Sequence, residues 1–209
     1  MPTQLIDATE RYFFADPASG KGKLKKLQAR QAIVGIAVDP LVRVFVIYAW
    51  AGKLPTDKYR DKIISAYASY RPKKFGIESN AMQVLFGDLV KDEARKKYGN
   101  VRIVPIPSPT KVEKDFKIQT AIESILNNGR LFIPEEFIEL RAEIRGFPTY
   151  YVKDLIDCLA MCVMMIPKRR KAHQISAEIH QLAEYLRNTG APSHYINQRV
   201  SELKTQLLS

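Results

Sequence analysis

The 209-residue sequence is poor in several features that mark common protein classes. It has two cysteines, too few for a disulfide-rich scaffold or a cysteine-ligated zinc site. Cys158 and Cys162 fall in one apolar helical run, so we expect two reduced thiols on one face of a buried helix. No apolar run reaches the roughly 18 residues of a membrane span. The N-terminus also has no basic-then-apolar leader. These absences favour a cytosolic globular protein without a membrane partner.

Acidic residues are outnumbered, with 22 Asp and Glu against 33 Lys and Arg, a formal net charge of +11. Such an excess indicates a polyanionic partner, although charge runs are also common on solvated surfaces. Residues 168–171 form one basic cluster. We expect a second cluster to contact nucleic-acid phosphates: Lys21, Lys23, Lys25, Lys26 and Arg30.

The pattern of apolar runs predicts an α/β fold. Three extended segments, Glu10 to Asp16, Ala32 to Val38 and Val42 to Tyr48, are typical of an antiparallel meander. The other predicted strands run from Lys74 to Glu78, from Val101 to Pro105 and from Leu131 to Ile133. The predicted helices are one to about Tyr70, one from Asn80, one to Leu126, one from Pro134 to about Arg145 and a buried one from Asp154 to Ile166. Two amphipathic helices follow after Ala172.

This order implies three antiparallel strands followed by parallel strands with right-handed crossovers, flanked by helices. That is the ribonuclease H-like arrangement. We expect residues 1–167 to form this domain and residues 168–209 to form a C-terminal helical appendage.

Four acids occupy positions suited to holding divalent cations. Asp16 ends the first strand and Glu78 ends the fourth, while Asp154 and Asp157 open the buried helix on one face. A carboxylate beside apolar residues is costly to bury unless something neutralises it. We expect Asp16 to bridge two ions of Mg²⁺ or Mn²⁺, which prefer oxygen ligands, and Glu78 and Asp154 to hold one ion each.

Asp157 is a further ligand or an orienting group in this hypothesis. Each acid also has an ordinary structural interpretation. Asp16 precedes Pro17 and suits a turn, while Glu78 and Asp154 suit helix starts.

Four motifs carry a resemblance to a known family. They are Phe14-Ala15-Asp16-Pro17-Ala18, Phe75-Gly76-Ile77-Glu78-Ser79-Asn80, Gly129-Arg130-Leu131-Phe132-Ile133-Pro134, and the stretch from Phe147-Pro148 to Lys153-Asp154-Leu155-Ile156-Asp157-Cys158-Leu159-Ala160. In this order they resemble the nuclease domain of phage large terminase subunits, the DNA-packaging motors. The resemblance covers roughly residues 11–167. That family often has paired aspartates at the last helix, where this chain has Lys153 first.

The resemblance implies a metal-dependent endonuclease that cuts double-stranded DNA during genome packaging in the host cytoplasm. It implies the portal or procapsid and the small terminase subunit as partners. Three lysines, Lys111, Lys114 and Lys117, stand where the family often carries basic residues and are predicted phosphate contacts. The chain contains no G-x-x-x-x-G-K-[ST] loop, so we expect no motor activity from it.

Two other functions fit the same residues. A Holliday-junction resolvase or a transposase-like nuclease uses the same carboxylate chemistry. A basic nucleic-acid-binding module with purely structural acids would account for the net charge alone.

Overall fold

The computed structural model describes residues 9–17, 30–39, 41–79, 83–107, 111–167 and 172–208. The chain divides into two compact units, Met1–Ile166 and Pro167–Ser209. The predicted roles of residues 1–167 and 168–209 as nuclease domain and appendage stay a prediction.

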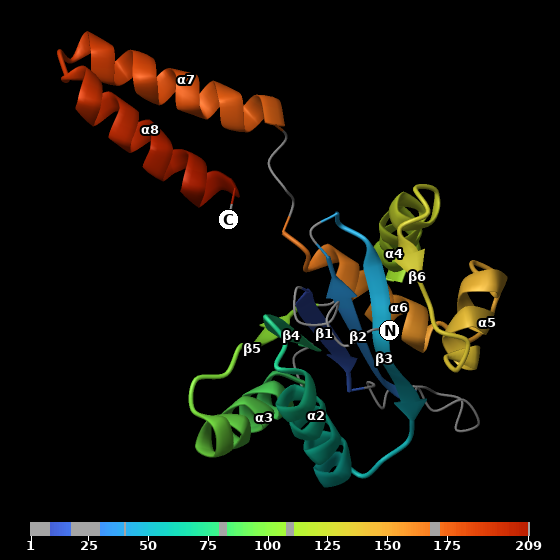
Figure 1. The fold of residues 1–209 in the computed structure, drawn as a ribbon. Coiled ribbons are helices and arrows are strands. Elements are labelled where there is room, and N and C mark those ends of the chain that lie inside the picture. Colours follow the sequence, from blue (N-terminus) through green and yellow to red (C-terminus); the bar gives the residue numbers. More distant parts are fainter. Residues whose placement is uncertain are drawn as a thin grey trace. The chain divides into compact units, whose positions relative to one another are not determined.

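The first unit is built on a six-stranded mixed sheet of order β5-β4-β1-β2-β3-β6 (Figure 1). The strands are β1 Glu10–Asp16, β2 Gln31–Val38, β3 Val44–Gly52, β4 Lys74–Glu78, β5 Ile103–Ile106 and β6 Leu131–Phe132. Strands β1, β2 and β3 pair antiparallel, β4 lies parallel to β1, β5 parallel to β4, and β6 parallel to β3. This confirms the predicted ribonuclease H-like sheet.

Helices cover both faces of the sheet. They are α2 Thr56–Tyr70, α3 Gln83–Tyr98, α4 Lys111–Leu126, α5 Ile138–Gly146 and α6 Asp154–Met164 in the first unit, and α7 Ala172–Asn188 and α8 Ser193–Leu208 in the second. Figure 1 shows α2 and α3 together on one side of the sheet, and their apolar residues share one core. Those of α4, α5 and α6 share the core on the other face. Among the described residues, no helix is both long and apolar enough to cross a bilayer.

Strand β1 shows why both faces must be covered. Its side chains alternate, so Tyr12 and Phe14 enter the core with α6, while Phe13 and Ala15 enter the core with α2. All four are at most 2% exposed. Phe13 lies across from Gly35 of β2, and a Cβ built on that glycine would lie 2.2 Å from the Phe13 ring. Only glycine leaves room for the ring there.

Some element boundaries differ from the predicted ones. The helix expected from Pro134 begins at Ile138, because residues 135–136 form a turn in which the Phe137 N–H bonds the Pro134 carbonyl at 3.3 Å. Strand β5 begins at Ile103 rather than Val101. Asn80, the expected start of α3, lies outside the described residues. In the second unit, the two predicted helices are present and pack against each other.

Candidate active site

Two of the predicted acids end neighbouring parallel strands. Ala15 of β1 pairs with Ile77 of β4, so the next residues, Asp16 and Glu78, lie side by side at one edge of the sheet. Asp16 continues the alternation of Phe14 and therefore faces α6. Asp16 is 9% exposed and Glu78 7% exposed. The sheet therefore buries two carboxylates next to each other on one face.

Glu78 faces the same side as Asp16. It stands two residues after Gly76, and a Cβ built on Gly76 would contact Phe14 and Met165, which follows α6. Within the described part of the chain, no hydrogen bond or ion pair reaches the Glu78 carboxylate. A buried carboxylate is costly without a compensating charge or donor, so this position suits a cation.

The backbone at Asp16 is held from the opposite face of the sheet. The Tyr59 hydroxyl of α2 reaches the carbonyl oxygens of Asp16 and Ala32, each at 2.9 Å, so its one proton is shared between them. Burial raises the pKa of Tyr59 well above its ordinary value, and the nearby charges of Asp16 and Glu78 raise it further. Tyr59 therefore stays a neutral donor that joins the end of β1 to the start of β2.

The other two predicted acids open α6, as expected. Asp157 is 6% exposed, while the Asp154 side chain is 26% exposed. Helix α6 packs against β1 and β2, and the Cys162 Sγ donates to the Val34 carbonyl at 3.3 Å. Both thiols are free and buried, which confirms the prediction for Cys158 and Cys162.

The N-terminus of α6 is capped by a residue from another helix. Glu143 of α5 accepts hydrogen bonds at Oε2 from the backbone N–H groups of Leu155 (2.8 Å) and Ile156 (2.9 Å). These N–H groups have no partner inside a helix and usually bind an N-cap side chain, which Lys153 does not supply. Burial raises the pKa of the Glu143 carboxyl to about 7, against the lowering effect of the two N–H donors.

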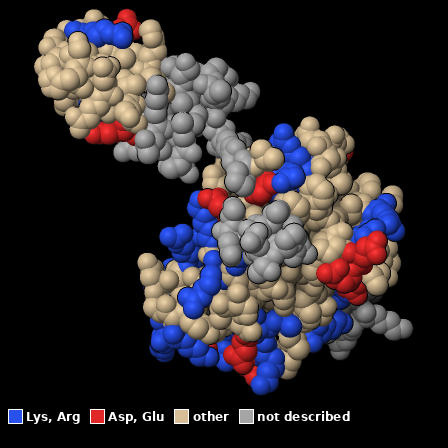
Figure 2. Space-filling view, viewed as in Figure 1, with Lys and Arg blue, Asp and Glu red and all other residues tan. Residues whose placement is uncertain are grey.

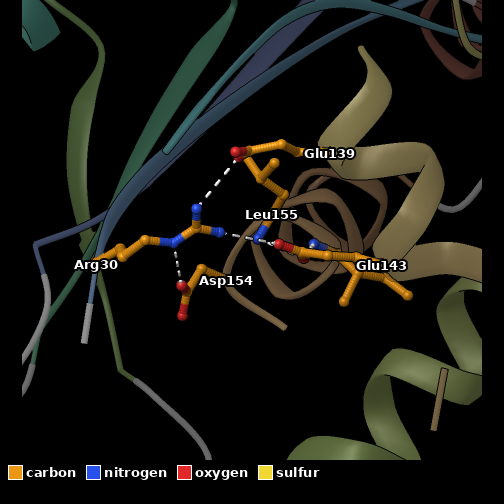
Figure 3. A network of polar contacts seen from close by, with 6 residues as sticks. Arg30, Glu139, Glu143, Asp154 and Leu155 are labelled. Atoms are coloured by element: carbon orange, nitrogen blue, oxygen red, sulfur yellow. Dashed lines mark hydrogen bonds and ion pairs between the residues drawn. The ribbon is translucent and has the colours of Figure 1, made fainter. Parts of the chain in front are cut away.

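Arg30 joins this cap to the candidate site (Figure 3). Its guanidinium contacts three carboxylates: Nη2 lies 3.3 Å from Glu143 Oε1, Nε lies 3.2 Å from Asp154 Oδ2, and Nη1 lies 3.2 Å from Glu139 Oε2. Burial opposes the charge of Arg30, but its three acidic partners raise its pKa above the ordinary value. The cationic side chain thus sits at the centre of an acidic cluster.

Arg30 also shows which end of the sheet carries Asp154. It directly precedes β2, and Ala32 near the start of β2 pairs with Asp16. The contact between Arg30 and Asp154 therefore places the start of α6 at the sheet edge where Asp16 and Glu78 lie. Asp16, Glu78 and Asp154, which are far apart in the sequence, therefore lie toward the same end of the sheet.

These acids provide only oxygen donors, which is the set that Mg²⁺ and Mn²⁺ prefer. Asp16 and Glu78 fit such an ion by position and burial. Within the described ranges, no group of three or more His, Cys, Asp or Glu side chains is arranged to hold a metal ion. The metal roles of Asp16, Glu78, Asp154 and Asp157 stay predictions.

The predicted DNA contacts are placed only in part. Lys21, Lys23, Lys25 and Lys26 lie outside the described residues, as do the side chains of Lys111 and Lys114 on α4. Lys117 is half-buried on α4, and Arg30 is engaged with carboxylates. Phosphate binding by these residues stays a prediction.

Lys153 stands where the resembled family often has an aspartate, and the structure gives it another role. Its Nζ lies 3.0 and 3.1 Å from the two carboxylate oxygens of Asp115 on α4. It also lies 5.3 Å from the centre of the Phe147 ring. The lysine therefore ties the start of α6 to α4.

Sequence reasoning missed Glu143 and the hydroxyl of Tyr59. One signal for Glu143 was present: it stands three residues after Leu140 and four before Phe147, on the apolar stripe of its helix. An acid in such a stripe needs a polar partner. The carbonyl partners of Tyr59 depend on strand ends brought together by folding, so no local signal announced them.

No protein-family model matches the chain, and no curated protein matches it in sequence. Among solved structures, the large terminase nuclease from thermophilic phage G20c aligns with a TM-score of 0.54 at 12% identity, over 77% of this chain and 84% of that one. The P22 large terminase nuclease domain aligns at 0.48 and 12% identity, over 76% and 82%. T. thermophilus RuvC, in complex with a Holliday junction substrate, aligns at 0.43 and 11% identity, over 73% and 90%. The first likeness shows that the chain shares the fold of a nuclease.

Proposed function

We propose that this chain is a metal-dependent endonuclease that hydrolyses phosphodiester bonds of double-stranded DNA. The observation that carries the proposal is the pair of buried carboxylates, Asp16 and Glu78, at the ends of adjacent parallel strands. The start of α6, with Asp154 and Asp157, lies at the same sheet edge. The net charge of +11 suits DNA binding, but carboxylates at this end of the sheet repel phosphates. A surface that only binds DNA would therefore not need them.

In this proposal Asp16, Glu78 and Asp154 hold two ions of Mg²⁺ or Mn²⁺, and Asp157 either joins them or orients a neighbour. Such ions supply an activated water and offset the charge of the phosphate during cleavage. The chain itself contributes rigidity. Tyr59 fixes the backbone at Asp16, and Glu143 fixes the turn of α6 that carries Asp154.

The proposed substrate rests on charge. Lysines and arginines outnumber the acids on the surface over α2, α3 and β5 in Figure 2. Phosphate contacts of this kind position a duplex without reading its sequence, so we expect weak sequence preference and strong salt dependence. The terminase resemblance and the G20c likeness support a role in phage genome packaging in the host cytoplasm, with the portal or procapsid and the small terminase subunit as partners.

Nicking of supercoiled plasmid in Mg²⁺ or Mn²⁺ tests this proposal. We expect cleavage by the wild-type chain, none in EDTA, and a loss on the order of 100-fold in Asp16→Asn. The matched control is Asp92→Asn, because Asp92 is an exposed acid on α3. Thermal unfolding measured over a range of Mn²⁺ concentrations gives a second readout. The ion should raise the unfolding midpoint temperature of the wild type and of Asp92→Asn more than that of Asp16→Asn.

Equal cleavage by Asp16→Asn and the wild type would refute the site. Intact DNA with every divalent metal, together with no Mn²⁺-dependent shift, would favour a non-catalytic binding module. Preferred cutting of four-way junctions over linear duplex would keep the nuclease chemistry and replace packaging by junction resolution.

A further inference from the structure

A basic pocket lies at the end of the sheet opposite to the candidate active site. Its volume is about 490 Å³, within the range of small-molecule sites. It forms where β1 begins, where α2 ends, and just before β4 and β5 begin. The side chains that matter for its chemistry are Glu10, Arg11, Tyr67, Arg71, Lys73 and Arg102.

The charge of this basic pocket is strongly positive. Its one carboxylate, Glu10, is already paired with Lys73 and accepts a hydrogen bond from the Tyr12 hydroxyl. Arg11, Arg71 and Arg102 also line the pocket, and within the described residues neither Arg71 nor Arg102 has a carboxylate within ion-pairing distance. Like charges brought together around a hollow repel one another, and an anion between them removes that repulsion.

The backbone of the pocket is held in place by hydrogen bonds between elements. The Arg102 N–H donates to the Tyr67 hydroxyl at 3.2 Å, which ties the start of β5 to α2. The Lys73 N–H donates to the Arg11 carbonyl at 2.8 Å, and Arg11 Nη1 donates to the Tyr70 carbonyl at 2.8 Å. Four elements, β1, α2, β4 and β5, are therefore joined around the hollow before any ligand arrives.

Arg71 has a backbone conformation that arginine rarely adopts. It caps the end of α2 with φ of 45°, in the left-handed region where glycine is the usual residue. Its Nε donates to the Ala68 carbonyl at 3.3 Å and its guanidinium lies 5.7 Å from the centre of the Tyr98 ring, which together limit the movement of the side chain. A non-glycine residue in this conformation carries backbone strain, which glycine at the same position would remove.

We propose that this basic pocket binds a phosphate group, carried either by a nucleic-acid backbone or by a free nucleoside phosphate. Arginine forks match the oxygens of phosphate in paired hydrogen bonds, and three arginines around one hollow favour phosphate over a singly charged carboxylate. The seven residues of β1 separate the pocket from Asp16 by about 20 Å. A phosphate bound here is therefore distinct from one at the candidate active site, and its binding needs no divalent cation.

Binding measured on the full chain in EDTA tests this inference independently of cleavage. One titration uses a fluorescent 20-base-pair duplex and the other uses ATP, over a range of salt concentrations. The double variant Arg71→Gly with Arg102→Ala should lose about tenfold in affinity for the occupant. If the duplex is the occupant, the slope of log affinity against log salt should fall by about 1.

The control is Arg95→Ala, which removes one positive charge from an exposed position on α3 outside the pocket. We expect its affinity to stay within about twofold of the wild type. Arg71→Gly alone should unfold at the same temperature as the wild type or higher, because glycine relieves the left-handed backbone. This variant separates a binding defect from a folding defect.

A loss confined to the duplex identifies a nucleic-acid backbone as the source, and a loss confined to ATP identifies a free nucleotide. Both results support the phosphate site. Unchanged affinities in the double variant, an equal loss in Arg95→Ala, or a wild type that binds neither probe would overturn it.

Discussion

Glu143 should determine the stability of the start of α6, and replacing it by alanine tests this. Alanine removes the acceptor of the Leu155 and Ile156 N–H groups, and these residues are only 2% and 1% exposed, so water cannot easily replace it. Loss of a cap costs roughly 1 kcal/mol, and each buried donor left unpaired costs about 1–3 kcal/mol. We therefore expect Glu143→Ala to lower the free energy of unfolding by about 3 kcal/mol near pH 5.

The assay uses the one tryptophan of the chain. Trp50 lies in β3, so its fluorescence in a urea titration reports the first unit without interference from α7 and α8. Hydrogen exchange at the Leu155 and Ile156 amides should lose protection in the same variant. Glu139→Ala is the control, because Glu139 also contacts Arg30 but its side chain is 62% exposed, and it should cost less than about 0.5 kcal/mol.

The pH dependence gives this prediction a sign. Since burial raises the pKa of Glu143 to about 7, the folded state holds a proton that the unfolded state releases near its ordinary value of 4.5. The wild type should therefore lose about 3 kcal/mol of stability relative to Glu143→Gln as pH rises through this window. Wild-type stability that stays constant or rises with pH relative to Glu143→Gln, or a Glu143→Ala variant as stable as Glu139→Ala, would refute the reasoning.

Three further variants test other contacts. Tyr59→Phe should lower the free energy of unfolding by about 1–2 kcal/mol in urea titrations, because the Asp16 carbonyl loses its donor. It should also weaken the Mn²⁺-dependent thermal shift. An unchanged shift would show that Tyr59 does not support the metal site. Gly35→Ala should cost about 3 kcal/mol in the same titration, because the new Cβ meets the buried Phe13 ring, and a cost below about 0.5 kcal/mol would contradict the packing. Burial alone would raise the pKa of Asp39, but hydrogen bonds from neighbouring N–H groups lower it below its ordinary value. Asp39→Asn should thus be less stable than the wild type at neutral pH. The difference in free energy of unfolding between the two should shrink as the pH falls through that lowered pKa.

Strand-level features of this fold could be predicted because local patterns determine them. The alternation in β1 and the acid before Pro17 located the strand end at Asp16, and the short run to Glu78 located another. Their adjacency follows once β1 and β4 pair in parallel, which the order of elements implied. Each of these predictions uses neighbours in sequence or a general rule of topology.

Features that depend on contacts between distant residues could not be predicted. The basic neighbours of Arg30 predict phosphate binding, which stays a prediction, but nothing in the sequence announces its contacts with carboxylates more than 100 positions away. The α5 boundary was displaced because propensity favours a helix at Pro134, whereas the turn at residues 135–136 depends on how the chain leaves β6. Tertiary packing decided both.

The position of Arg30 bears on the metal role proposed for Asp154. Arg30 Nε lies 3.2 Å from Asp154 Oδ2, so under that proposal a divalent ion would share the carboxylate with the guanidinium, and repulsion between the two cations would lower the apparent affinity for the ion. A guanidinium that shifts away from Asp154 keeps Glu139 and Glu143 as partners. Under the same proposal, loading of this corner would depend on how readily one arginine changes neighbours, as well as on the chemistry of the ion.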